Sequence, residues 1–316
     1  MDLLIAALGQ GALYAPMALG VFIAFRILNT PDLTIDGSFV FGMTVSAYVA
    51  ITGHPYLALL SGIAAGALAG SVTGFLQTKL KINPILSGIL TMTALYTVNY
   101  AVLGGQSNLY LQKMVENELG IEVPTASATV YKLLAFGDAR EISDLVLTAA
   151  VTVAVVAGLA VFFKTRPGIA IRATGDNEEM VRSSSINADG TRIAGIMLAN
   201  GLVALSGALV CQQQRYADLG SGSGMLVVGL ASVIIGQAFF GRRGVTVGLV
   251  SAVLGSLFYR VILQIAYQID MPTYTVKLLS AAIVTVALVL PLLKERAAYG
   301  LRRKNAAVKA SREAQQ

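Results

Sequence analysis

The segment from Lys164 to Arg192, KTRPGIAIRATGDNEEMVRSSSINADGTR, is dense in charge and lies between two long apolar stretches. Within it, Gly175–Ile186 carries a helix-start pattern, because Asp176 can cap a helix and Glu179 follows three residues later. Acidic residues in the first turn and Arg182 further along suit the helix dipole. The pattern predicts a short polar helix held between two membrane spans. A solvated connector that only joins two apolar halves is the alternative.

The composition restricts the class of protein. Of the 316 residues, 55% are hydrophobic and 13% are charged, which is too apolar for a soluble domain and indicates an all-α polytopic membrane protein. The single Cys211 excludes an internal disulfide, and with the single His54 it argues against a zinc or histidine site. The phosphate-binding pattern GxxxxGKS/T does not occur, so this chain is not itself a P-loop ATPase. We expect no catalytic residues and no metal site.

Nine apolar stretches can each cross a membrane as a helix, since a hydrocarbon core about 30 Å thick needs roughly 20 apolar residues. Residues 1–104 and 193–293 hold four spans each, and residues 144–163 hold a linking span. A polar external loop, the charged segment and a basic tail occupy residues 105–143, 164–192 and 294–316. The expected spans are Leu3–Phe25, Gly37–Thr52, Tyr56–Thr78, Pro84–Gly104, Leu145–Phe163, Ile193–Gln213, Met225–Phe240, Val245–Gln264 and Tyr274–Leu293.

Lysine and arginine are divided unevenly between the two sides of these spans. Seventeen of the 23 basic residues fall on one side, at Arg26, Lys79, Lys81, residues 164–192, Arg242, Arg243 and the tail. The other six are Lys113, Lys132, Arg140, Arg215, Arg260 and Lys277. The positive-inside rule therefore places the charged segment and the C-terminus in the cytoplasm, with the N-terminus and the loop 105–143 outside. This asymmetry accounts for the net charge of +6 without a nucleic-acid partner.

A repeat with an offset of about 186 residues relates the two blocks of spans, as Gly9 with Gly195 and Asp32 with Asp218 illustrate. An odd span between four-span copies forces them into opposite orientations, so two inverted four-helix repeats are predicted, with a path at their interface. Coincidental matches between glycine-rich apolar segments are the alternative. A stripe of glycines is predicted to pack helices closely, within the subunit or across a dimer. The stripe is Gly62, Gly66, Gly70 and Gly74.

Two stretches place small, hydroxyl-bearing and acidic residues where a helix begins near a membrane face. They are Asp36-Gly37-Ser38 and Ser221-Gly222-Ser223. Irregular backbone at such positions needs protein or water as a hydrogen-bond partner, so both stretches are predicted to flank a translocation path, with simple helix capping as the alternative. Asn200 and Gln237, uncharged and polar within spans, are further path candidates, although each could only bridge helices.

The charged segment resembles the coupling helix of ABC-importer permeases of the ribose and branched-chain amino acid family, which docks into a groove of the ATPase subunit. The resemblance assigns ATPase coupling to Gly175, Asp176, Asn177, Glu178, Glu179, Arg182, Ser185 and Ile186. Ser185 stands where that family usually has glycine, which bears on where the helix ends. The run from Asp32 to Phe39 resembles a subgroup associated with lipoprotein binding components and aromatic amino acid uptake.

The resemblance implies the fold of type II importers in a bacterial inner membrane. It implies a permease homodimer, two ABC ATPase subunits and an extracytoplasmic solute-binding protein, with ATP and Mg bound by the ATPase rather than by this chain. Arg260 and Lys277 could then dock the binding protein or meet a substrate carboxylate, with snorkelling to the outer headgroups as the alternative. The expected function is passage of a small solute, such as an aromatic or branched-chain amino acid. An ion-gradient-driven secondary transporter or channel is the alternative.

Overall fold

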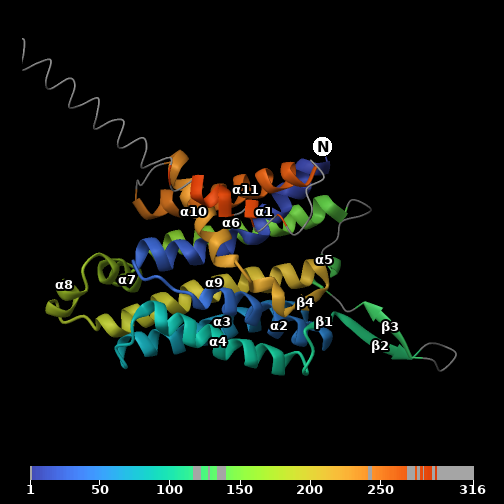
Figure 1. The fold of residues 1–316 in the computed structure, drawn as a ribbon, viewed down its shortest axis with the longest axis horizontal. Helices are drawn as coiled ribbons and strands as arrows, with labels where there is room; N and C mark the ends of the chain where they lie inside the picture. Colours follow the sequence, from blue (N-terminus) through green and yellow to red (C-terminus); the bar gives the residue numbers. More distant parts are fainter. Residues whose placement is uncertain are drawn as a thin grey trace, which may run out of the picture.

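The computed structural model describes residues 2–116, 122–126, 129–133, 140–240, 244–268, 275, 278–279, 281–286 and 289. Within these ranges eight helices are long and apolar enough to cross a membrane, and they lie side by side along a common direction (Figure 1). The membrane part is therefore all-helical, as predicted. The eight are α1 (Asp2–Phe22) with the π-helix η1 (Ile23–Ile27), α2 (Thr34–Ile51), α3 (Pro55–Thr78), α4 (Pro84–Val102), α6 (Arg140–Phe162), α9 (Ala188–Gln214), α10 (Met225–Phe240) and α11 (Gly244–Gln268).

The predicted spans agree with these helices except at their ends. α2 begins at Thr34 rather than Gly37, and α9 begins at Ala188 rather than Ile193, because the first turn of each helix is polar and hydropathy does not register it. The ninth predicted span, Tyr274–Leu293, lies largely outside the described residues, as do Lys277 and the tail. The inverted relation between the two halves stays a prediction.

Short elements occupy the two ends of the helix bundle. At one end lie α7 (Arg166–Asp176) and α8 (Glu178–Ser183). At the other end lie α5 and two antiparallel strand pairs (Figure 1). The pairs are β1 (Asn108–Tyr110) with β4 (Tyr216–Asp218) and β2 (Gln112–Glu116) with β3 (Glu122–Ala126), and α5 is Val130–Leu133. The sequence predicted only a polar loop over most of this region, because strands of three to five residues are too short to show a clear alternation.

α9 forms the centre of the bundle and packs against α1, α2 and α3. Its residues from Ala199 to Gln212 are buried without interruption, and many of them are Gly, Ala or Ser. A Cβ atom on Gly207 would overlap the carbonyl oxygen of Phe39 in α2, so only glycine allows this approach. The glycine stripe of α3 packs in the same way, with Gly66 against Asn200 and Gly70 against Ile196. The stripe therefore serves packing within the subunit.

This packing predicts opposite outcomes for two glycine-to-alanine changes. Gly207→Ala should lower the thermal stability of the detergent-solubilised protein by about 1–3 kcal/mol, because the two backbones must separate. Gly158→Ala, on a part of α6 where an added Cβ meets nothing within 4 Å, should leave stability unchanged or raise it by up to about 1 kcal/mol. Size-exclusion profiles after heating measure both variants. Equal profiles for the two variants would contradict the packing described for α9.

Candidate functional site

The charged segment folds into two short helices rather than one. α7 ends at Asp176, and Asn177 adopts an extended backbone with φ −156° and ψ 100°. Its side-chain oxygen then accepts a hydrogen bond of 3.0 Å from the backbone N–H of Met180, so Asn177 is the N-cap of α8. The prediction that Asp176 caps this helix, with Glu179 reaching back, is therefore wrong by one residue. Asp176 is still helical and its side chain cannot take the capping position.

The end of α8 explains the residue at position 185. Ser185 has φ +60°, in the left-handed region that glycine adopts most readily. The backbone N–H of Ser185 donates to the carbonyl of Arg182, and that of Ile186 donates to the carbonyl of Val181. These two bonds form a Schellman motif, which normally has glycine at this position. Ser185 therefore ends the helix at some cost in backbone strain.

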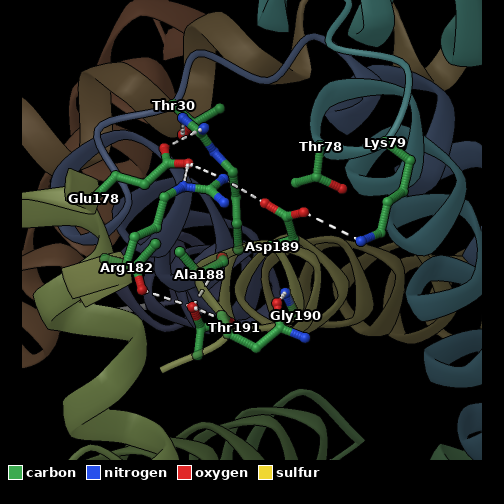
Figure 2. Close-up of polar contacts among 12 residues, drawn as sticks. Thr30, Thr78, Lys79, Glu178, Arg182, Ala188, Asp189, Gly190 and Thr191 are labelled. Atoms are coloured by element: carbon green, nitrogen blue, oxygen red, sulfur yellow. Dashed lines mark hydrogen bonds and ion pairs between the residues drawn. The ribbon is translucent and has the colours of Figure 1, made fainter. Parts of the chain in front are cut away.

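Ion pairs attach α8 to the ends of two spans (Figure 2). Glu178 binds Arg182 at 2.7 Å and Arg192 of α9 at 2.8 Å, and Arg182 also binds Asp189. Lys79, at the end of α3, binds the other oxygen of Asp189 at 3.1 Å. Hydrogen bonds to Glu178 and then Asp189 raise the pKa of Arg182. Because Arg182 and Lys79 are largely exposed, this cluster fixes geometry more than it adds stability.

The connector 28–33 runs from η1 back along the bundle to the start of α2 (Figure 1). Near α7, Asn29 donates to the carbonyl of Gly175 at 3.1 Å, and Thr30 accepts from Arg192 at 3.2 Å. Asp32 is fully buried and accepts from the backbone N–H of Thr34 at 2.8 Å. Irregular backbone within a membrane bundle needs such protein partners.

Asp32 belongs to a buried polar cluster that includes two of the predicted path residues. Its second oxygen accepts from Asn200 Nδ2 at 2.7 Å, and Ser38 Oγ donates to Asn200 Oδ1 at 2.7 Å. Ser38 and Asn200 both have no exposed surface in this chain. Here they join α2 to α9.

The two predicted stretches of small residues meet although they are far apart in sequence. Asp36 accepts hydrogen bonds from the backbone N–H groups of Gly224 at 3.1 Å and Leu226 at 2.7 Å, so its carboxylate caps α10. Gly222, in the short 3-10 helix η2 (Leu219–Gly222), packs against the carbonyl of Asp36. This junction lies inside the candidate span Leu219–Phe240, so α10 begins within the bundle.

The other residues of the two stretches lie beside this junction in different surroundings. Gly37 lies against Met92 and Leu95 of α4. Ser221 donates to Asp218 at 3.3 Å, and Ser223 is exposed. The two stretches therefore do more than cap their own helices, since they join α2, α4 and α10.

Gln237 lies elsewhere, at a cavity of about 370 Å³ between η1, α7, α10 and α11. The cavity borders α7, and about half of its lining residues are polar. Its polar lining residues are Arg26, Asn29, Arg172, Asp176 and Gln237.

Arg260 points into the bundle between α11 and α1. Its guanidinium carbon lies 3.5 Å from the centre of the Tyr14 ring, and Nη1 lies 3.5 Å from Gln10 Oε1. A cation–π contact of this kind accommodates a charge that would be costly in lipid. Docking of a binding protein by Arg260 and Lys277 stays a prediction, and Lys277 lies outside the described residues.

Sequence reasoning missed a polar face on α4. Thr93, Tyr96, Thr97 and Tyr100 are all exposed and follow the helical spacing of three and four residues. Thr93 donates to the carbonyl of Ile89 in its own helix at 2.8 Å. The phenol groups of Tyr96 and Tyr100 cannot reach their own helix in this way and suit water or protein partners. The spacing is visible in the sequence, but tyrosine is also an ordinary residue of apolar spans, so composition alone does not reveal this face. Among the described residues, no group of His, Cys, Asp and Glu could hold a metal ion.

Comparisons with known proteins agree with this architecture. The family described as branched-chain amino acid transport system permease component matches residues 3–288. A tyrosine transport system permease protein of Clostridioides difficile (strain R20291) is 35% identical over 285 residues, 90% of each chain. An uncharacterized protein of Rickettsia prowazekii (strain Madrid E) is 30% identical over 91% of this chain and 97% of its own. A nucleoside ABC transporter permease protein of Lactococcus lactis subsp. cremoris (strain MG1363) is 26% identical over 70% of this chain and 67% of its own. No solved structure gives a significant match.

The strained end of α8 yields a test. Ser185→Gly should stabilise α8 by about 1 kcal/mol, because glycine adopts a positive φ without a Cβ clash. Amide hydrogen exchange over residues 177–187, measured by mass spectrometry, should become slower. Ser184→Gly is the matched control, since Ser184 has φ −85° and gains no such relief. Unchanged or faster exchange in Ser185→Gly would show that this residue is not strained.

Proposed function

This chain belongs to the family of branched-chain amino acid transport permease components, and we propose that it forms the membrane path of a binding-protein-dependent ABC importer. The predicted family resemblance is confirmed. Such a permease is not itself catalytic, and its family generally implies a separate ATPase and a solute-binding protein as partners. ATP and Mg would then bind the ATPase subunit.

The observation that carries the proposed mechanism is the attachment of α8 to the bundle. α8 is capped at both ends, and its Glu178 and Arg182 bind residues at the start of α9. Met180 is 53% exposed on this helix, beside the exposed Glu179 and Ser184, which gives a partner protein an apolar contact within a polar surface. A force applied to α8 by an ATPase would therefore reach the spans directly.

We place α8 in the cytoplasm and the paired strands outside. The basic residues Arg26 and Lys79 lie at the helix ends near α8, and the positive-inside rule assigns that end to the cytoplasm. The N-terminus would then lie outside and the C-terminus in the cytoplasm of a bacterial inner membrane. β1 and β4, with the exposed pair Tyr110 and Tyr216, would face the binding protein.

The inverted repeat is supported by reciprocal packing of the two halves. α9 packs against α3 as α1 packs against α11, and α2 pairs with α3 as α10 pairs with α11. In this scheme α2 and α10 are equivalent helices that run in opposite directions from the junction at Asp36 and Gly224. Discontinuous helices that meet in this way are typical of transport sites.

We propose that the path runs beside this junction, between two copies of the chain. The α4 face with Tyr96 and Thr97 is exposed in a single copy, as is Ser223 at the start of α10. A water-filled path would provide the hydrogen-bond partners that lipid cannot. The residues that would support and shape this path from behind are Asp36, Gly37, Ser38, Asn200, Ser221 and Gly222. Gln237 lines the separate cavity beside α7, and its place in the path stays a prediction.

The proposed substrate is an amino acid, with an aromatic one favoured. The relative with 35% identity is named for tyrosine transport. Tyr96 and Tyr100 offer ring faces, and Thr93 and Thr97 offer hydroxyls, on the face assigned to the path. Stacking and hydrogen bonding of this kind suit a phenol or a similar ring.

Crosslinking tests the cytoplasmic role of α8. A single cysteine at Met180 or Ser184 should form a crosslink to the ATPase subunit, and Tyr216→Cys, at the opposite end, should not. The native Cys211 is fully buried, so background reaction is low. Labelling of the Met180 or Ser184 cysteine by an impermeant reagent added outside intact cells would refute the orientation.

Thiol accessibility tests the path. Tyr96→Cys should react with a water-soluble maleimide and the reaction should block uptake, because a water-filled path reaches this position. Leu68→Cys on α3 is the matched control, since Leu68 is 63% exposed and Tyr96 62%, but its surroundings are apolar. Equal reaction rates at the two positions would mean that α4 faces lipid rather than a path.

A further inference from the structure

Arg192 connects α8 to the connector 28–33, which Asn29 also ties to Gly175 of α7. Its Nη1 binds Glu178, the first residue of α8, at 2.8 Å, and its Nη2 binds the hydroxyl of Thr30 in the connector 28–33 at 3.2 Å. The Arg192 side chain is 24% exposed and that of Glu178 31% exposed, so water screens this pair less than the outer ion pairs. One planar guanidinium thus holds two elements with two of its donors.

The connector is held at Thr30, Asp32 and Leu33. The Thr30 N–H donates to the carbonyl of Ala24 at 3.0 Å, which ties the connector to η1. Asp32 is held by Thr34 and Asn200, and Leu33 packs against Gly88 of α4. Thr30 and Asp32 are buried and hydrogen-bonded within the protein, whereas Asn29 and Pro31 on either side of Thr30 are exposed, so these two buried residues hold the connector in place.

The connector ends at the helix that holds the start of α10. Asp36 lies in the first turn of α2 and binds the first amides of α10 through both carboxylate oxygens. Polar contacts therefore run from α8 through Arg192 to Thr30 in the connector. Beyond the end of the connector, Asp36 continues them to the start of α10. The part of α9 between Arg192 and Asn200 rises about 12 Å, so this route passes from the bundle end into its interior.

We propose that Arg192 is a positioning residue for transport, which couples the position of α8 to the start of α10 through Thr30 and the connector. The proposal rests on the proposed function, since it assumes that an ATPase moves α8. Lysine cannot replace Arg192 in this role, because an ammonium group on a flexible stem does not span both acceptors in a fixed plane.

A neighbouring ion pair provides the control. Lys79 and Asp189 belong to the same charged cluster, but their contact reaches Glu178 only through Arg182 and does not include the connector. Lys79→Gln removes a charge from the cluster and leaves the Arg192 contacts in place. It therefore separates a general loss of charge from the loss of this particular link.

The experiment reports the movement of α10 and needs no knowledge of the substrate. A cysteine at Val227, which is 38% exposed near the start of α10, is labelled by a water-soluble maleimide in the complex with the ATPase, with and without a non-hydrolysable ATP analogue. In the otherwise unchanged chain, the analogue should change the labelling rate. Thr30→Val and Arg192→Lys should each reduce this nucleotide-dependent change by about tenfold, as expected for loss of a hydrogen bond to a charged group. Lys79→Gln should keep it within about twofold.

The double variant Thr30→Val with Arg192→Lys should lose no more than the worse single variant, since both changes break one link. If Arg192→Lys fails to assemble with the ATPase, Thr30→Val decides, because it leaves every ion pair intact. A full nucleotide response in Thr30→Val, or losses that multiply in the double variant, would overturn the proposal. Absence of any nucleotide response in the otherwise unchanged chain would instead refute the proposed ATP-driven function, and the coupling role with it.

Discussion

The carboxylate of Asp36 binds the first backbone amides of α10, and much of the architecture depends on this contact. A helix that begins inside a membrane bundle exposes N–H groups that lipid cannot satisfy. A carboxylate at that position satisfies two of them and is itself stabilised by the helix dipole, typically by about 0.3–2 kcal/mol. The contact also requires α2 to begin close to the start of α10. The connector 28–33 must therefore return into the bundle.

That return explains the buried polar residues around the connector. Thr30 and Asp32 have almost no exposed surface, and each has its partners within the protein. Asn200 serves both Asp32 and Ser38, so one amide of α9 anchors the connector and the helix that follows it. Close approach of α9 to α2 at Gly207 makes these short bonds possible. Packing by small residues and the polar junction are thus parts of one arrangement.

Hydropathy predicted the spans because membrane helices must be long and apolar whatever their neighbours are. The helix ends were less predictable. Asn177 rather than Asp176 caps α8, because capping depends on which residue leaves the helical backbone. Serine in place of the expected glycine at position 185 left the end of this helix open in the sequence, and the positive φ of Ser185 shows that the helix ends there.

The site was predicted in part. Residues Asp36–Ser38 and Ser221–Ser223 were singled out from their small and polar character, and the fold brings them together. The burial of Gly37, Ser38 and Gly222 could not be foreseen, because it depends on which helices pack over them. Arg192 attracted no attention in the sequence, since a basic residue in a charged segment is unremarkable until its two partners are known. The face with Tyr96 and Thr97 could have been found from helical spacing alone.

The most direct test of this account is uptake of tyrosine into proteoliposomes that contain this chain, its ATPase and its binding protein. ATP is supplied on the side of the membrane that carries the ATPase, and tyrosine-loaded binding protein on the opposite side. Tyrosine should then accumulate on the ATPase side against its concentration gradient. Removal of either ATP or the binding protein should abolish it, while collapse of ion gradients by ionophores should leave it unchanged. Accumulation that continues without ATP and follows an imposed ion gradient would contradict the account.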